Sequence, residues 1–239
     1  MRLTLLGTGD AVGTPKIGCS CPQCVSALQR GISRTRTSLL LESDSHHLLI
    51  DTSPDAKFQL LRAGSPYIDA VIWTHGHYDH YAGYGEFYRV QDPPAVYGDP
   101  HVLSYCSQFF SFLSYNKCPV EAYRPFMLFG MQITLLPVNH PPVPTFGLRI
   151  ETKEAVIGYT ADSRSDISHE TRTCLEGVDL LLIDGMVPPD MHLNKHMNYE
   201  EACCLAEDLG VRSFRCVHLS HLMPWELPCL GMDMDTWNW

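Results

Sequence analysis

The stretch that decides the fold is VIWTHGHYDHYAG, residues 71–83. It belongs to a run of β-branched and aromatic residues, DAVIWTH (69–75), which is typical of a buried strand that ends where the chain must turn. Side chains at the carboxyl end of such a strand are held by a rigid base and reach into a cleft. The residues of this stretch that commonly bind metals are His75, His77, Asp79 and His80.

The spacing of these four side chains indicates a metal site. His75 and His77 lie two positions apart, so they point the same way in an extended segment, while Asp79 and His80 follow as the chain turns. Imidazole and carboxylate ligands together favour zinc, manganese or iron. Two such metals about 3.5–4 Å apart would activate a nucleophile. The remaining ligands must therefore come from other parts of the chain.

Composition restricts the class of protein. The chain has 239 residues, of which 45% are hydrophobic and 18% charged, so we expect one globular domain over residues 1–239. The net charge of -10 argues against an extended nucleic-acid surface, which needs clustered Lys and Arg. No apolar run approaches the roughly 18 residues of a membrane span, and no signal peptide is evident, so we expect a cytoplasmic protein without a membrane partner. Whether it forms a homodimer is left open.

Ten cysteines in a chain of this kind indicate reduced thiols or metal ligands rather than disulfides. Cys106, Cys174, Cys203 and Cys204 lie in apolar or helical contexts, and we expect them to be buried and not to bind metal.

Short apolar runs separated by polar clusters predict a β-rich α/β protein. Helices are expected at 56–64, ending at Gly64 as a C-terminal glycine cap, at 165–177, and at 198–210, where Asn198 would be the N-cap. The expected strands are LTLL (3–6), SLLLE (38–42), HLLID (47–51), DAVIWTH (69–75), AVYG (95–98), MQITLLPV (131–138), FGLRIE (146–151), AVIGYT (155–160), DLLLID (179–184) and FRCVHL (214–219).

The motif HGHYDH resembles the HxHxDH signature of the metallo-β-lactamase superfamily, and the rest of that pattern follows along almost the whole chain. The resemblance implies a four-layer αββα sandwich. It also implies that His75, His77 and His140 (in LLPVNH) hold one divalent metal, zinc or manganese. The other ligands that it implies are Asp79, His80 and His218 for a second metal, with Asp162 (in GYTAD) bridging the two, and Asp51 as a supporting aspartate.

A second cluster, GCSCPQC, places Cys19, Cys21 and Cys24 close together in a segment with little apolar content. A structural zinc normally takes four protein ligands, so a distant residue must complete the set. His221, in VHLSH, is the candidate, with His218 left for the other site. We expect one structural zinc here.

The cysteine cluster, which follows an N-terminal LGTG, is similar to that of the phosphoribosyl cyclic phosphodiesterases within the superfamily. In that branch a hydroxide bridging two metals attacks a small phosphodiester in line with the leaving oxygen. A histidine outside the metal ligands suits protonation of the leaving group, since its ordinary pKa is about 6.5. The catalytic set that the resemblance implies is His196, its partner Asp184 and the metal ligand Asp79.

The substrate implied is 5-phosphoribosyl 1,2-cyclic phosphate or a 2′,3′-cyclic nucleotide. His192 competes with His196 for the acid role, and the sequence does not decide between them. Arg34 and Arg36 are not assigned to the site, because arginines before a strand are usually solvated or paired. Two other functions remain: tRNA 3′ processing of the tRNase Z kind, and a metal protein like that of pyrroloquinoline quinone biosynthesis.

Overall fold

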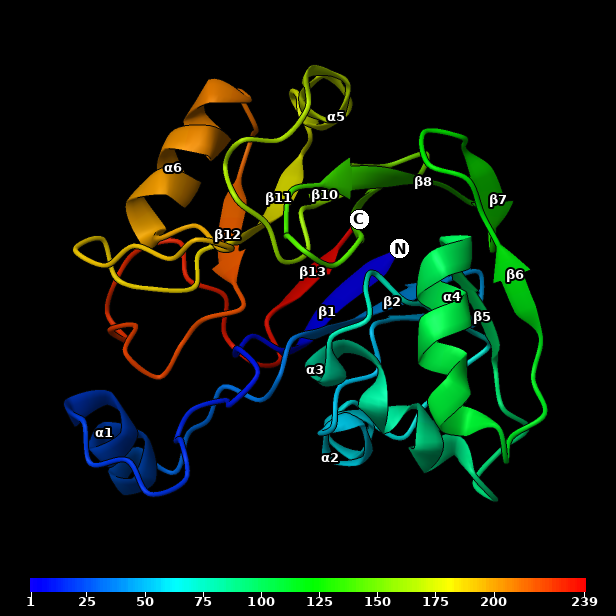
Figure 1. Cartoon of the computed structure of the whole chain (residues 1–239), viewed down its shortest axis with the longest axis horizontal. Coiled ribbons are helices and arrows are strands. Elements are labelled where there is room, and N and C mark those ends of the chain that lie inside the picture. The colour runs from blue at the N-terminus through cyan, green and yellow to red at the C-terminus, as the bar shows by residue number, and fades with distance from the viewer.

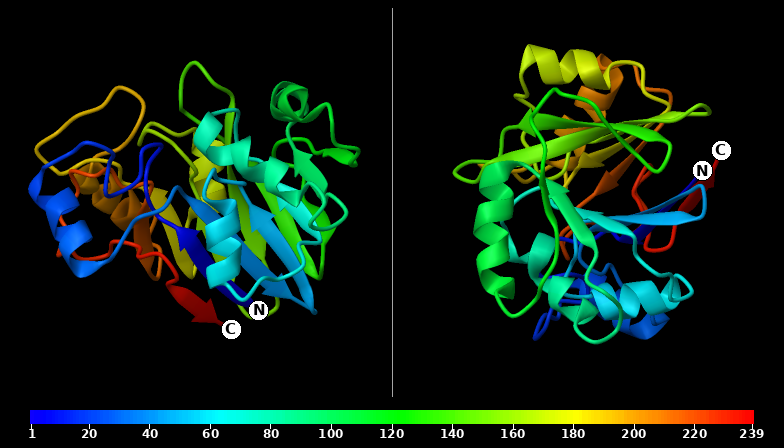
Figure 2. Two further views of the ribbon diagram at one scale, coloured as in Figure 1. Left: turned by 90° about the horizontal axis from the view of Figure 1, so that it is seen from below. Right: turned by 90° about the vertical axis from the view of Figure 1, so that its right-hand side faces the viewer.

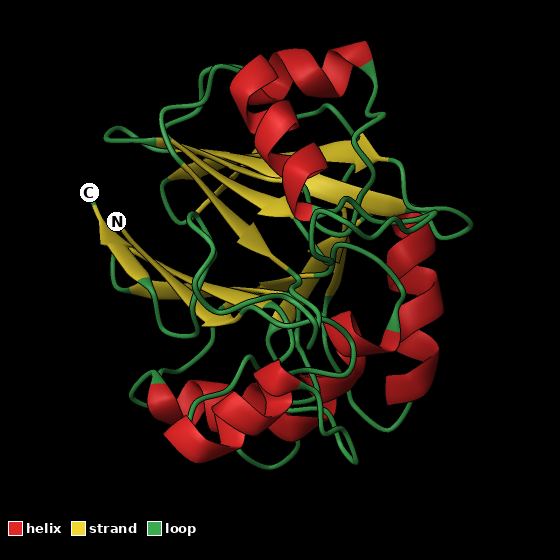
Figure 3. Cartoon of the chain, turned by 90° about the vertical axis from the view of Figure 1, so that its left-hand side faces the viewer, coloured by secondary structure: helices red, strands yellow, loops and turns green.

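The computed structural model describes residues 1–239 and contains two β-sheets that face each other, with helices outside both (Figure 3). This arrangement confirms the predicted α/β class and the four-layer sandwich. The first sheet has the order β13 (Thr236–Asn238), β1 (Arg2–Gly7), β2 (Ser38–Ser43), β3 (His46–Ile50), β4 (Ala70–Ile72), β5 (Ala95–Gly98) and β6 (Lys117–Pro119). The second has the order β12 (Phe214–Val217), β11 (Leu180–Asp184), β10 (Val156–Tyr159), β9 (Thr145–Glu151), β8 (Met131–Val138) and β7 (Phe126–Leu128).

The core follows from strands that are apolar on both faces. β4 and β11 are buried along their whole length, as expected of strands covered by a sheet on one side and by helices on the other. The larger apolar cluster joins residues of both sheets, such as Leu41 and Leu148, and fills the space between them. A smaller cluster packs the second sheet against the helices outside it, through Leu181 and Leu205 for example.

The helices are short and divided between the two outer layers and one edge (Figure 1). α2 (Ala56–Arg62) and α4 (Pro100–Cys106) contact the first sheet, while α5 (His169–Leu175) and α6 (Tyr199–Asp208) contact the second. α1 (Pro22–Arg30) stands apart from both sheets, as Figures 1 and 2 show. The short α3 (Tyr78–Tyr81) follows β4 and continues into the 3-10 turn η1 (Ala82–Phe87), and a second 3-10 turn, η2 (Ser107–Phe110), follows α4.

Local sequence determines where these helices begin. The predicted cap at Asn198 is confirmed: its side chain accepts a hydrogen bond from the backbone N–H of Glu201, whose carboxylate in turn accepts from the backbone N–H of Asn198. The helix expected over 165–177 begins later than predicted, because Ser168 is the residue whose side chain caps α5. No helix of the chain is both long and apolar enough to cross a membrane.

Strand direction brings the polar strand ends to one edge of the sandwich. β3, β4 and β5 are parallel, and so are β10, β11 and β12. β8 runs the same way as β10, because each is antiparallel to β9. The carboxyl ends of these strands therefore meet at one edge of the two facing sheets. The residues that follow or end these strands there are Asp51, His75, His140, Asp162, Asp184 and His218.

Several elements differ from the sequence predictions. The strand expected over 69–75 is regular only at 70–72, so His75 lies beyond its end. The short strands β6, β7 and β13 and the helices α1, α3 and α4 were not predicted. They are short and carry little apolar periodicity, and β6, β7 and β13 lie at sheet edges. Of the four cysteines expected to be buried, only Cys106 is; Cys174 and Cys203 are half-buried and Cys204 is exposed.

Candidate metal centre

The first cluster of ligand atoms brings together side chains that follow β4, β8 and β10. His77 Nδ1 lies 3.2 Å from His75 Nε2 and 3.1 Å from His140 Nε2. Asp162 Oδ2 is 3.6 Å from His75 Nε2 and 3.9 Å from His140 Nε2. These four atoms converge on one point from three separate strand ends.

The second cluster shares Asp162. Asp79 Oδ2 lies 3.3 Å from His80 Nε2 and 3.2 Å from His218 Nε2. The carboxylate of Asp162 reaches both histidines, with Oδ1 3.3 Å from His80 Nε2 and Oδ2 3.2 Å from His218 Nε2. Asp162 is thus the one side chain that belongs to both clusters.

The geometry of both clusters fits a metal ion. Nitrogen and oxygen ligands about 2.0–2.2 Å from a tetrahedral zinc lie about 3.3–3.6 Å from one another, close to the separations found here. His80 Nε2 and Asp162 Oδ1 are buried and have no hydrogen-bond partner, which is costly unless something else binds them. A cation would satisfy both atoms.

Residues behind the ligands fix their orientation. Asp51 Oδ2 accepts a hydrogen bond from His80 Nδ1 at 2.7 Å and another from the Thr74 hydroxyl at 2.8 Å. Its other oxygen accepts from the Thr74 backbone N–H at 2.9 Å. The Thr74 hydroxyl also lies 3.0 Å from His75 Nδ1. Asp51 therefore orients one histidine of each cluster, as the supporting partners of metal ligands do; Thr74 was missed, because a single threonine before a histidine carries no signal.

At two ligand residues, the surrounding charges and burial favour the protonation state that binds a metal. Burial and the neighbouring His80 lower the pKa of His75 well below its ordinary value, so its imidazole is neutral. Burial alone would raise the pKa of Asp162, but His218 and His80 outweigh it and hold that pKa well below the usual range. Burial also lowers the pKa of His80, yet Asp162 and Asp79 raise it well above normal. A metal ion at His80 would therefore take the place of a proton.

Backbone strain marks the same region. Asp51, Ala161 and His218 have φ values of 59°, 50° and 59°, in the left-handed region that residues with a Cβ rarely adopt. Each of these residues follows a strand of the central sandwich. Such conformations cost about 1–3 kcal/mol each and persist where the surrounding structure imposes them, often at functional sites.

His196 lies beside the two clusters without being part of either. Its Nδ1 is 2.7 Å from Asp184 Oδ2, and its ring is stacked on that of His218 with centroids 5.1 Å apart. The side chain of His196 is 13% exposed, whereas that of His192 is 76% exposed and lies 3.8 Å from Glu201. The structure therefore places His196, and not His192, next to the ligands.

The cysteine cluster is assembled from both ends of the chain. His221 Nδ1 lies 3.5 Å from the Sγ atoms of Cys19 and Cys21 and 3.8 Å from that of Cys24. Tetrahedral zinc with three thiolates and one imidazole would separate sulfur and nitrogen by about 3.6 Å. Burial alone would raise the pKa of Cys21, but the Cys24 backbone N–H and His221 lower it to about 6, which favours a thiolate. The four residues fit a structural zinc.

We expect Cys21→Ser to lower the zinc content by about one ion per chain, because one thiolate of a closed four-ligand site is lost. Metal analysis by inductively coupled plasma mass spectrometry of the purified protein measures this. Cys204→Ser is the matched control, since Cys204 is exposed and belongs to no cluster. Unchanged zinc in Cys21→Ser would mean that the cluster holds none.

The segment that carries His218 and His221 is held by Arg34, for which the sequence predicted a solvated or paired side chain outside the site. Arg34 is only 1% exposed. Its guanidinium donates to the Met223 carbonyl at 2.8 Å and to the Pro224 carbonyl at 3.3 Å, and it stacks 4.0 Å from the Trp225 ring. Arg34 thus pairs with backbone carbonyls, and its role is to position this loop.

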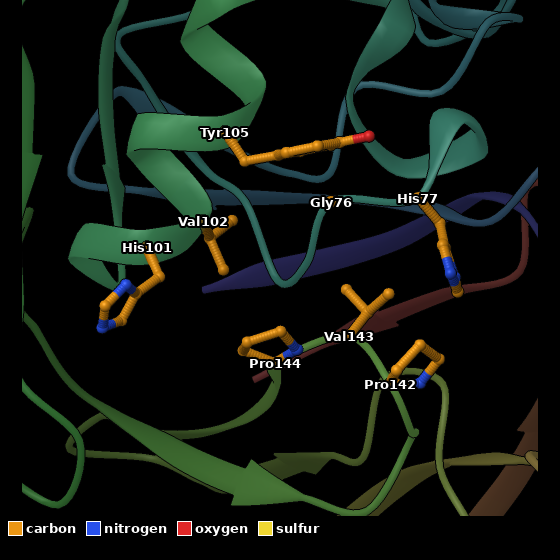
Figure 4. A pocket seen from close by; sticks show the side chains of 8 residues that line it. All are labelled: Gly76, His77, His101, Val102, Tyr105, Pro142, Val143 and Pro144. Atoms are coloured by element: carbon orange, nitrogen blue, oxygen red, sulfur yellow. The ribbon is translucent and has the colours of Figure 1, made fainter.

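A cavity of about 350 Å³ opens beside the first cluster. Figure 4 shows Tyr105 of α4 on one side, Val143 and the flanking prolines on the other, and His77 at one end. Tyr105 was missed, because a single aromatic residue in a short helix has no distinguishing spacing.

Comparisons with known proteins find a matching family model and several relatives. The family model described as "Beta-lactamase superfamily domain" matches residues 46–219. The chain is 32% identical over 237 residues to an octanoyltransferase of Porphyromonas gingivalis; the match covers 94% of this chain but only 47% of that protein, so the chain spans about half of this relative. It is 30% identical to coenzyme PQQ synthesis protein B of Rhodopseudomonas palustris, covering 81% of this chain and 76% of that protein.

Among solved structures, the fold is similar to one described as a new diphosphatase from the PhnP family. The TM-score is 0.87 at 27% sequence identity, and the match covers 100% of this chain and 97% of that one.

Proposed function

The chain belongs to the beta-lactamase superfamily, and from this premise we propose that it is a metal-dependent hydrolase of small cyclic phosphodiesters, 5-phosphoribosyl 1,2-cyclic phosphate or 2′,3′-cyclic nucleotides. The observation that carries this proposal is the pair His196 and Asp184, which lies against both ligand clusters. The diphosphatase of similar structure supports chemistry at phosphorus.

We assign two metal positions to the two clusters. His75, His77 and His140 would hold one ion, with Asp162 shared between the two. The second ion would be held by Asp79, His80 and His218. Divalent zinc or manganese there would supply Lewis acidity toward the phosphoryl oxygens and activate water for attack. The protein contributes by fixing these ligands, through Asp51 and Thr74, before substrate arrives.

His196 is assigned to the leaving group. Its Nδ1–H donates to Asp184, which leaves Nε2 as the ring nitrogen that can give a proton to the departing alkoxide. The ring lies 4.7 Å from that of His140 and 5.1 Å from that of His218, so a phosphodiester held at the clusters would be within its reach. Asp184 is buried and also accepts from the Ser163 backbone N–H at 2.8 Å, which keeps its carboxylate in place.

Two alternatives are less well supported. A tRNA-processing nuclease needs a surface that binds a long polyanion, whereas this chain carries a net charge of -10. A non-catalytic metal protein of the PQQ type would not need every ligand position of a dinuclear site, and here each is filled.

The test is an assay of the purified protein with added zinc or manganese. We expect metal-dependent hydrolysis of bis-p-nitrophenyl phosphate and of 2′,3′-cyclic nucleotides, and loss of it with a chelator. A tRNA precursor and a β-lactam serve as comparison substrates. The proposal fails if no phosphodiester is cleaved with either metal, or if the tRNA precursor is the only substrate.

A further inference from the structure

The cavity beside the first ligand cluster is built by the segments that carry the ligands. Gly76 and His77 form one side, and Pro142, Val143 and Pro144 follow directly after His140. α4 closes the remaining side with Val102 and Tyr105 (Figure 4). A phosphoryl group held at His77 and His140 would therefore have its organic substituent next to this cavity.

Tyr105 presents a flat surface there. Its ring lies against the backbone of Gly76, so closely that a Cβ at residue 76 would be 2.6 Å from Tyr105 Cδ1. The side chain is 50% exposed, and its hydroxyl makes no hydrogen bond within the chain. Glycine between the two ligand histidines is thus what allows this aromatic ring to lie beside the metal centre.

The opposite side of the cavity is rigid and apolar. The turn after His140 is closed by a hydrogen bond from the Val143 backbone N–H to the His140 carbonyl at 3.2 Å. The Thr145 hydroxyl donates to the Val143 carbonyl at 3.0 Å, and the Phe146 backbone N–H donates to the Thr74 carbonyl at 3.1 Å. Val143 is therefore held in place before any ligand binds, at the floor that faces Tyr105.

The lining of this cavity offers little to hold a second phosphate. Neither lysine nor arginine lines it, and its titratable side chains are those of two histidines and a tyrosine. Arg164 lies in a separate pocket with His196, where its guanidinium pairs with Asp166 at 2.9 Å. A phosphorylated sugar would find no permanent positive charge next to Tyr105.

We propose that this cavity binds an uncharged planar ring, such as a nucleobase, carried by the phosphodiester, and that Tyr105 is a specificity-determining residue. The inference rests on the proposed function, because it places the phosphate at the metal ligands. Of the two substrates named above, it selects the 2′,3′-cyclic nucleotide over 5-phosphoribosyl 1,2-cyclic phosphate. Stacking of a base on an aromatic side chain tolerates any base, since every base has a π-face.

The test compares two sugar phosphates, one with and one without a base. Binding of adenosine 5′-monophosphate and of ribose 5-phosphate to the zinc-loaded chain (residues 1–239) is measured by calorimetry. We expect the nucleotide to bind about tenfold more tightly, because stacking of one base on an aromatic side chain contributes affinity of this order. Tyr105→Ala should remove the difference in affinity between the two ligands. Tyr105→Phe should keep the preference for the nucleotide, because the base stacks on the aromatic ring and does not need the hydroxyl.

Phe109→Ala is the matched control. Its ring lies 5.8 Å from that of Tyr105 and is exposed, but it does not line the cavity, so the preference for the nucleotide should persist. Equal affinity of the unmodified protein for the two ligands, or an unchanged preference in Tyr105→Ala, overturns the inference. Hydrolysis of bis-p-nitrophenyl phosphate on the same preparations separates this failure from that of the proposed function.

Discussion

Replacing His75 with alanine is expected to lower metal-dependent phosphodiester hydrolysis more than 100-fold. His75 Nε2 is part of the first ligand cluster, and its imidazole is fully buried. Removing only the hydrogen-bond partner of a metal ligand typically costs about 10–100-fold in metal affinity or activity, so loss of the ligand itself should cost more. The rate constant for bis-p-nitrophenyl phosphate at saturating manganese or zinc measures the effect.

The control for His75→Ala is the substitution of a histidine on the protein surface. His169 is exposed in α5 and belongs to no cluster, so His169→Ala should keep both activity and metal content. Metal analysis should show a loss in His75→Ala, while circular dichroism should show that the fold is kept. Full activity in His75→Ala would remove the first cluster from the mechanism.

His196→Ala is expected to slow substrates with poor leaving groups by about 10²–10⁴-fold, the range usual for a positioned general acid. A p-nitrophenolate leaves without a proton, so the activated ester should be slowed far less than a 2′,3′-cyclic nucleotide, whose leaving group is a sugar alkoxide. The ratio of kcat values for the two substrates is the measurement, because a merely structural change would lower both.

The matched variant for this second prediction is His192→Ala. His192 is near in sequence but largely exposed, and its closest acidic partner is Glu201 rather than Asp184. We expect His192→Ala to leave the ratio unchanged. Equal slowing of both substrates by His196→Ala, or a selective effect of His192→Ala, would reject the acid role of His196.

Much of the fold could be read from local patterns. All ten predicted strands are present, because runs such as DLLLID (179–184) are apolar on both faces and can only be buried in a layered fold. The cap of α6 was predicted correctly, since Asn198 satisfies backbone donors next to it in sequence, whereas α5 begins at the Ser168 cap rather than at residue 165. The missed α1 and α4 begin at Pro22 and Pro100, where proline occupies a first-turn position that local reading easily takes for a loop.

The candidate site divides in the same way. The sequence by itself identified HGHYDH as a metal-binding segment from its spacing, whereas His140, Asp162 and His218 were predicted as ligands through the resemblance to the superfamily. Only the tertiary structure decided how they meet: parallel strands bring their carboxyl ends to one edge, Asp162 falls between two clusters, and His196 rather than His192 turns inward. The types and spacing of residues show which side chains can bind a metal. The burial of Arg34 and the position of Tyr105 against Gly76, in contrast, depend on contacts between segments that are distant in the sequence.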